Sequence, residues 1–211
     1  MRNLLYKELS LSIHKFFYLL PFLLGALLLI PQWIFILVFM YFFWITVPQI
    51  YGAYIANSDY DFCYMLPVSK KDIVVSKALS LMIIESLHMI FAIIFGIIHN
   101  LWHGSMTFML DVNLAFFGIA FLMYGLFNIV FLTQYFKTGY HFGKPIIYGV
   151  IVTLVYGFLI EFTNIKYSGF TKIFEGEFST QLIVLIGCIV VGVLLNVVAV
   201  KQSVKNFERI Q

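Results

Sequence analysis

The sequence predicts an all-α membrane protein with six transmembrane helices, on the evidence of its composition and its hydropathy pattern. Of 211 residues, 62% are hydrophobic and only 11% are charged, whereas soluble domains are roughly 45–50% apolar and about 25% charged. A soluble fold of this length has too small an interior to bury so much apolar surface. The apolar residues form continuous runs, which favour helices over a β-barrel, because backbone polar groups in lipid must be paired internally.

Six apolar runs define the predicted spans, and we place them at residues 16–30, 33–55, 78–98, 114–132, 146–160 and 182–200. The first and fifth runs have 15 residues, or about 22 Å at a helical rise of 1.5 Å per residue. Because the hydrocarbon core is about 30 Å thick, we expect both helices to extend by a turn through flanking residues. Pro48 is expected to kink the second span, since proline cannot donate to the carbonyl one turn earlier.

The two ends of the chain are more polar than the runs between them. Residues 1–15 place Leu5, Leu9 and Ile13 at a spacing of four, while Lys7 and Glu8 occupy much of the other side. This pattern predicts an amphipathic helix that lies in the membrane interface. We expect one transmembrane domain over residues 1–211, with a short tail after the sixth span.

The distribution of Lys and Arg predicts the orientation of the chain in the membrane. With six spans, 11 of the 13 basic residues fall on one side, and only Lys166 and Lys172 fall on the other. Because short cytoplasmic loops are enriched in Lys and Arg, we expect both termini to be cytoplasmic. The chain is therefore predicted to be a multi-pass protein of a cell membrane, in contact with membrane lipids.

Motifs for common catalytic and metal sites are missing from the sequence. The segment from Gly139 to Lys144 is one residue too short for a P-loop and is followed by Pro145, so we expect the chain not to hydrolyse ATP by itself. We predict no catalytic residue, no metal site and no cofactor in this chain, and no nucleic-acid partner. Cys63 and Cys188 are far apart in different contexts, which predicts no disulfide.

Two ionisable residues lie inside the third predicted span. Glu85 and His88 are three residues apart and share a helix face, about 12 Å and 17 Å beyond Lys77 along the helix axis. One interpretation is a satisfied polar pair, bonded internally or to a neighbouring helix. The other is a polar element of a substrate path; a metal site would need more ligands. Asn128 and Asn196, in the fourth and sixth spans, are best explained as interhelical hydrogen-bonding groups.

The second predicted span is rich in aromatic residues. In a bilayer such residues mostly contact lipid or anchor the helix at the interface. The alternative is an aromatic wall that faces an apolar or amphipathic cargo. Under that alternative the residues of the substrate path, together with Glu85 and His88, are Tyr41, Trp44, Tyr51 and Tyr54.

A short basic segment, LPVSKKDIVVSK, separates the second and third spans. Pro67 ends the preceding element, and Ser69 is a good N-cap with Asp72 at a spacing that resembles a capping box. We therefore predict a capped helix over about 68–77 at the cytoplasmic surface, which runs into the third span. It could be an interfacial linker with basic anchors for lipid headgroups, or a docking element for a partner.

This segment carries a resemblance to a known family. The run MLPVSKKDIVVSKAL resembles the L-P-V-S-[RK]-x-x-[IL]-V-x-x-[KR] signature that follows the second span of small ABC-2 type transporter permeases. The likeness extends to an N-terminal helix with a Lys7-Glu8 pair, six spans and a short C-terminal tail. Within that family the chain looks most similar to permeases of phenol-soluble-modulin exporters, which expel amphipathic peptide toxins.

The resemblance implies a function, a coupling site and partners. The family member would be the permease of a bacterial plasma-membrane exporter, with two permease chains, as a homodimer or a heterodimer, and two ABC ATPase subunits that bind ATP and Mg²⁺. Its coupling helix would dock on the ATPase, and the expected cargo is an amphipathic peptide. The residues expected to couple to the ATPase are Pro67, Ser69, Lys70, Lys71, Asp72 and Ile73.

Three other interpretations remain open at this point. The first is a permease of the same architecture that exports lipids or drugs, which the sequence does not distinguish from a peptide exporter. The second is a non-transporting membrane protein, such as an immunity or sensor component. A membrane-embedded enzyme is the third, and only the Glu85–His88 pair suggests it.

Overall fold

The computed structural model describes residues 2–31, 33–104, 110–174 and 176–210. Met1 of the predicted 1–15 helix, Gln32 between the first two predicted spans, and the last residue of the predicted 1–211 domain lie outside the described residues. Within the described part the chain is all-helical, with 85% of the residues in helices and no strand. The all-α class predicted from composition is thereby confirmed.

Five helices of the described chain are long and apolar enough to cross a membrane. The five are the composite helix Ile36–Ala56, α6 (Lys70–His103), α7 (Leu114–Lys137), α8 (Gly143–Lys166) and α10 (Phe178–Glu208). All five end beyond the predicted runs, and α6, α8 and α10 also begin before them, because polar residues at these boundaries continue the helix. The composite helix instead begins at Ile36, inside the predicted 33–55 run, and α7 begins at the predicted Leu114.

The predicted interfacial helix over 1–15 and the first predicted span over 16–30 are separated by a sharp bend. Helix α1 (Arg2–Lys7) continues into a π-helical turn η1 (Glu8–Ser12), and the chain then bends by 99°. After the bend, α2 (Leu20–Ala26) lies between the 3₁₀ turns η2 (Lys15–Tyr18) and η3 (Leu27–Leu29). If this bent pair counts as one span, the described chain has up to six candidate spans.

The composite helix Ile36–Ala56 contains an irregular turn close to its proline. It consists of α3 (Ile36–Tyr41), a π-helical turn η4 (Phe42–Thr46) and α4 (Val47–Ala56), with Pro48 in the first turn of α4. A wider turn just before a proline relieves the clash with the carbonyl of the preceding turn. The irregularity expected at Pro48 is therefore a π-helical turn that immediately precedes α4.

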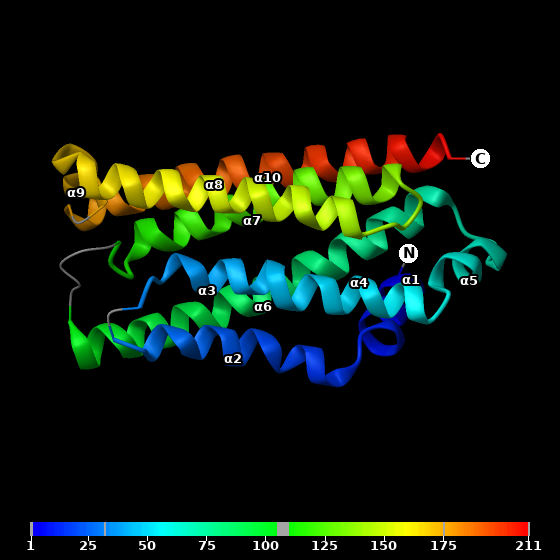
Figure 1. Ribbon diagram of the computed structural model, residues 1–211, viewed down its shortest axis with the longest axis horizontal. Coiled ribbons are helices and arrows are strands. Elements are labelled where there is room, and N and C mark those ends of the chain that lie inside the picture. The colour runs from blue at the N-terminus through cyan, green and yellow to red at the C-terminus, as the bar shows by residue number, and fades with distance from the viewer. Residues whose placement is uncertain (1, 32, 105–109, 175, 211) are drawn as a thin grey trace.

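The long helices lie side by side in a flattened bundle (Figure 1). One layer holds α7, α8 and α10, and the other holds α2, the composite α3–α4 helix and α6. Both described chain ends lie toward the same end of the bundle, near α1 and the short helix α5 (Asp59–Met65). The other short helix, α9 (Ser168–Phe174), lies at the opposite end.

Glycines bring the helix backbones close together at two crossings. A Cβ added to Gly125 on α7 would lie 3.0 Å from the backbone of Gly192 on α10. A Cβ on Gly25 of α2 would lie 3.2 Å from the backbone of Phe91 and Ala92 on α6. Small residues permit such approaches, and close packing is the main attraction between helices in lipid.

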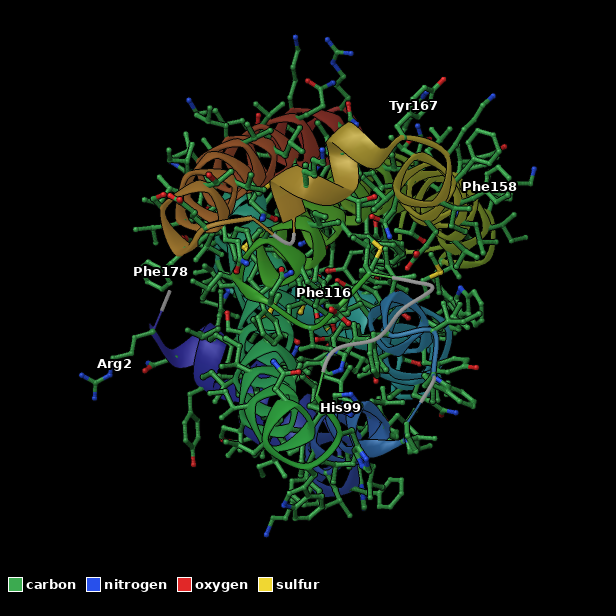
Figure 2. All side chains as sticks on the ribbon, turned by 90° about the vertical axis from the view of Figure 1, so that its left-hand side faces the viewer. Arg2, His99, Phe116, Phe158, Tyr167 and Phe178 are labelled. Atoms are coloured by element: carbon green, nitrogen blue, oxygen red, sulfur yellow. The ribbon has the colours of Figure 1, made fainter. Side chains whose placement is uncertain are left out.

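The interior of the bundle and its outer face differ clearly in their side chains. Phe116 on α7 is buried in the interior, whereas Phe158 on α8 and Phe178 at the start of α10 project outward (Figure 2). Most of the apolar side chains along α8 and α10 are exposed in the single chain. In a membrane, lipid or another chain covers such surfaces.

Candidate functional site

The segment between the composite helix and α6 forms the end of the bundle that carries the predicted coupling residues. Ser58 has a left-handed backbone conformation, with φ of 49°, which separates α4 from α5. Leu66 then ends α5 in an extended conformation. As a result, α5 projects beyond the ends of α4 and α6 (Figure 1).

Ser69 caps α6, as its spacing from Asp72 predicts. The Ser69 Oγ accepts a hydrogen bond from the Asp72 backbone N–H at 3.1 Å and donates one to the Asp72 carboxylate at 2.8 Å. The helix then runs without a break from Lys70 to His103. The residues of the predicted coupling helix are thus the first turns of the same helix that forms the third span.

The six predicted coupling residues fall into three groups in the structure. Pro67, Ser69 and Lys71 are exposed. Lys70 is half-buried, because its Nζ donates to the Ile210 carbonyl and lies 5.9 Å from the centre of the Phe207 ring on α10. The Asp72 carboxylate accepts a hydrogen bond from the Ser69 hydroxyl, and Ile73 is only 5% exposed. Ile73 therefore packs inside the bundle and does not present a surface to a partner.

Helix α5 presents apolar side chains that the sequence analysis did not single out. Phe62, Tyr64 and Met65 are 50%, 62% and 83% exposed, and they immediately precede the exposed Pro67. Large apolar side chains on a projecting helix mark an interaction surface when they cluster. We refer to Phe62, Tyr64 and Met65 as the α5 tip.

A buried ion-pair cluster lies behind the α5 tip and connects three segments. Lys7 of α1 donates to the Asp59 carboxylate of α5 and, at 3.1 Å, to that of Glu8. Lys77 of α6 donates to Asp59 at 2.5 Å and to Glu8 at 3.1 Å. Its Nζ also lies 3.6 Å from the centre of the Tyr54 ring. Glu8 and Lys77 are fully buried, so the first turns of α6 are fixed to the N-terminal helix by charge.

The cluster is electrically balanced, with two ammonium groups facing two carboxylates. Burial alone would raise the pKa of Asp59, but the attraction of Lys77 and the hydrogen bonds from both lysines outweigh it and lower that pKa. Burial would lower the pKa of Lys7, but Asp59 and Glu8 outweigh that effect and raise it. Both residues are therefore held in their charged forms.

Glu8, Asp59 and Cys63 are also close enough to hold a metal ion, with ligand atoms within 4.8 Å of one another. The two lysines already neutralise these carboxylates at hydrogen-bonding distance. A divalent cation would have to displace both ammonium groups. We therefore interpret this group as an ion-pair cluster and not as a metal centre.

A second polar cluster lies inside the apolar part of the bundle. The Asn128 Nδ2 on α7 donates to the Glu85 carboxylate at 2.8 Å and to the Asn196 Oδ1 at 2.9 Å. His88 bonds instead to the Tyr124 hydroxyl, with Nδ1 and oxygen 2.7 Å apart. Glu85 and His88 are both buried, and each finds its partner on a neighbouring helix. The two asparagines connect helices, as predicted.

The four predicted aromatic residues of the substrate path lie in two environments. Tyr51 and Tyr54 are 1% exposed, and the Tyr51 ring packs edge-on against Tyr135 of α7 with centroids 4.7 Å apart. Tyr41 and Trp44 are half-buried and form an edge-to-face pair 5.5 Å apart. Within the single chain, the first pair belongs to the packed interior, and the second pair is partly accessible from outside the bundle.

Helical spacing predicts an outer position for Glu8, and the helix predicted at the cytoplasmic surface includes Lys77, but neither pattern connects these residues with Asp59. The signal in the sequence is that both are charged residues next to an apolar run. If such a run packs in the interior, these charges require partners. Their pairing could not be identified, since Glu8 and Lys77 are 69 residues apart.

One comparison with known proteins gave a match. The model of a family described as "ABC-2 family transporter protein" matches residues 3–208, which is nearly the whole chain. No curated protein and no solved structure matches the chain significantly.

Proposed function

Because the chain belongs to the ABC-2 family of transporter proteins, we propose that it is the permease subunit of an ATP-driven exporter. The family match over residues 3–208 is the observation that carries this proposal, and five or six apolar helices fit a multi-pass membrane subunit. In this proposal the chain itself does not hydrolyse ATP. A separate ABC ATPase, in two copies, binds ATP and Mg²⁺ and acts on two permease chains.

The contact with the ATPase is proposed to lie at the α5 tip and the start of α6. Lys71, Ser69 and Pro67 are exposed there, next to the apolar side chains of the α5 tip. A displacement of this end would reach the membrane directly, since α6 continues into the apolar region without a break. The cytoplasmic position of this end and of both termini is part of the proposal and rests on the distribution of Lys and Arg.

The cargo is proposed to be an amphipathic peptide, on the strength of the sequence resemblance. The half-buried pair of Tyr41 and Trp44 offers partly accessible aromatic surface of the kind that the apolar side of such a peptide would contact. Export of lipids or drugs by the same architecture is the alternative. Stimulation of ATPase activity in the reconstituted complex by an amphipathic peptide, and not by lipids or lipophilic drugs, would decide between them.

Co-purification from native membranes in mild detergent tests the proposed ATPase contact. The test variant is Met65→Asp combined with Lys71→Glu, because both side chains are exposed and neither substitution disturbs the packed interior. We expect an ABC ATPase to accompany the wild type and to be lost from this variant. If no ATPase accompanies the wild type, the coupling proposal fails.

Lys172→Glu is the matched control for this experiment. Lys172 is exposed on α9, at the opposite end of the bundle from α5. The control reverses the same type of charge and should retain the ATPase. Loss of the ATPase from both variants would indicate a general effect of charge and would argue against a contact at the α5 tip.

A further inference from the structure

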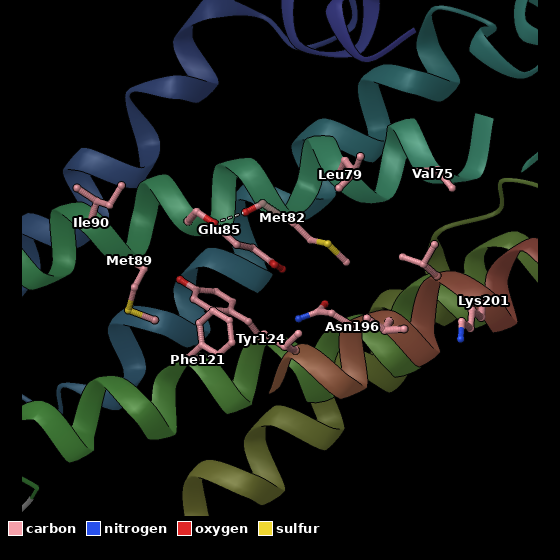
Figure 3. A pocket seen from close by; sticks show the side chains of 14 residues that line it. Val75, Leu79, Met82, Glu85, Met89, Ile90, Phe121, Tyr124, Asn196 and Lys201 are labelled. Atoms are coloured by element: carbon pink, nitrogen blue, oxygen red, sulfur yellow. Dashed lines mark hydrogen bonds between the residues drawn. The ribbon is translucent and has the colours of Figure 1, made fainter. Parts of the chain in front are cut away.

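The structure contains a cavity that opens on the side of the bundle, between α6, α7 and α10 (Figure 3). Its volume is about 670 Å³, within the range of small-molecule sites. Most of its lining is apolar, and it includes Met82 and Met89 on α6 and Val193 and Val197 on α10. Methionine side chains adapt their shape to different ligands, so this lining suits a lipophilic molecule.

One carboxyl group reaches into this apolar space. Glu85 lines the cavity and is 4% exposed, and its side chain extends from α6 toward Asn196 on α10 (Figure 3). Its Oε2 accepts from Asn128 at 2.8 Å, whereas its Oε1 has no hydrogen-bond partner among the described residues. A buried polar atom without a partner is costly, and the residue that carries this one is part of the cavity wall.

The Glu85 oxygen without a partner is an acceptor, so its missing partner is a hydrogen-bond donor. The Asn128 Nδ2 is shared between the Glu85 Oε2 and the Asn196 Oδ1, and the Asn196 Nδ2 donates to the Gly192 carbonyl at 3.0 Å. Both N–H donors of Asn128 and one of the two N–H donors of Asn196 are thus engaged, while the Glu85 Oε1 has no partner among the described residues. The complementary ligand group donates hydrogen bonds and is positively charged. Tyr124 and Phe121 also line the cavity, and aromatic faces attract cations.

We propose that this cavity binds lipophilic amines, with the ammonium group paired to Glu85 and the apolar body between α6 and α10. The entrance fits access from the membrane, because Ile90 and Val197 at the cavity are 53% and 45% exposed on the outer face of the bundle. A lipophilic amine reaches such an opening by partitioning into the bilayer first. The proposal concerns the permease chain alone and does not depend on an ATPase or on the cargo of the exporter.

Equilibrium binding to the full-length chain in phosphatidylcholine nanodiscs tests this proposal. The probe is rhodamine 6G, a fluorescent lipophilic cation whose ethylamino N–H groups donate hydrogen bonds, followed by fluorescence anisotropy against empty nanodiscs. We expect saturable binding to the wild type. Dodecylamine should displace the probe, and dodecanol, with the same chain and no charge, should do so at least tenfold more weakly. Equal competition by the two would show an apolar crevice without a role for the carboxyl and would overturn the proposal.

Three variants separate the carboxyl from the cavity itself. Glu85→Gln should weaken rhodamine 6G binding by about tenfold or more, and Val197→Phe should abolish it by filling the space while leaving the carboxyl in place. Glu161→Gln, which alters a carboxyl on α8 outside the cavity lining, should bind like the wild type. Wild-type affinity in both Glu85→Gln and Val197→Phe would refute the site. Monodisperse elution of each variant on size exclusion confirms that it is folded.

The entrance could instead be covered by a second copy of the chain. Val197→Cys, in a background with Cys63→Ser and Cys188→Ser, tests this in native membranes. Under the proposal, mild oxidation gives no crosslinked dimer, and rhodamine 6G protects the new thiol from a membrane-permeant maleimide. Efficient crosslinking between chains through residue 197 would assign this face to an interface and overturn the proposal.

Discussion

Lys77→Met is the substitution that tests most directly how the N-terminal helix is fixed to α6. The change removes the bonds from Lys77 to Asp59 at 2.5 Å and to Glu8 at 3.1 Å. Two buried carboxylates would then share the single ammonium group of Lys7. Loss of one partner from a buried ion pair costs about 3–5 kcal/mol. The equilibrium for opening of this region should therefore shift by about two to four orders of magnitude.

Cys63 provides the assay for this opening. It is 2% exposed beside Asp59 and Lys7, so a thiol reagent reaches it only when the cluster opens. In a Cys188→Ser background, we expect Lys77→Met to accelerate maleimide labelling of Cys63 at least a hundredfold. When opening and closing are fast, the labelling rate follows the population of the open form.

Two further variants show whether charge balance is the cause. Lys71→Met removes an exposed lysine from the same helix and should leave the labelling rate unchanged. Adding Asp59→Asn to Lys77→Met restores neutrality around the pair of Lys7 and Glu8, and should recover part of the protection. If Lys77→Met labels within threefold of the wild type, the ion-pair cluster does not hold this region closed.

Two more predictions follow from the ion-pair cluster and from the helix crossings. The pKa of Asp59 is lowered from 3.8, so its charge stabilises the fold above pH 3.8, and this stability is lost as pH falls through the folded-state pKa. The pKa of Lys7 is raised from 10.5, so its contribution to stability is complete below pH 10.5 and is lost as pH rises through the folded-state pKa. Protection of Cys63, after correction for the thiolate fraction, should be constant between about pH 5 and pH 9; a steep change within that window would contradict the assignment. Gly125→Val should lower the thermal unfolding temperature in detergent, because a Cβ there lies 3.0 Å from the Gly192 backbone. Gly187→Val on α10 should be tolerated, because a Cβ at Gly187 has no atom within 4 Å. Equal changes in unfolding temperature for the two variants would refute the close crossing.

The apolar runs predicted the helical class because hydrophobic length is a local property of the sequence. Boundaries were predicted less well, since a helix continues through polar residues until a cap or a turn ends it. The helix predicted over about 68–77 and the third span predicted over 78–98 form the single helix α6, but α6 continues beyond residue 98 to His103. The Ser69 cap was predictable because its partner, Asp72, is three residues away.

The orientation of individual side chains was harder to predict. In residues 1–15, helical spacing assigned Glu8 to the polar outer face, but Glu8 is fully buried. Its environment is set by Lys77, a residue from a distant helix, and periodicity carries no information about such pairing. Tyr51, one of the residues predicted for the substrate path, lies in the interior for the same reason, because its neighbour Tyr135 belongs to another helix.

Helix α6 joins the two regions considered above in one rigid rod. It has 34 residues, which corresponds to about 51 Å. Its first turns carry Lys71 and the ion pairs of Lys77, and its middle carries Glu85 at the cavity. A tilt of the rod imposed at Lys71 therefore also changes the spacing between Glu85 and α10. Binding free energies are linked reciprocally: an amine that prefers one tilt would alter the affinity for a partner at the α5 tip by the same factor as that partner alters the affinity for the amine.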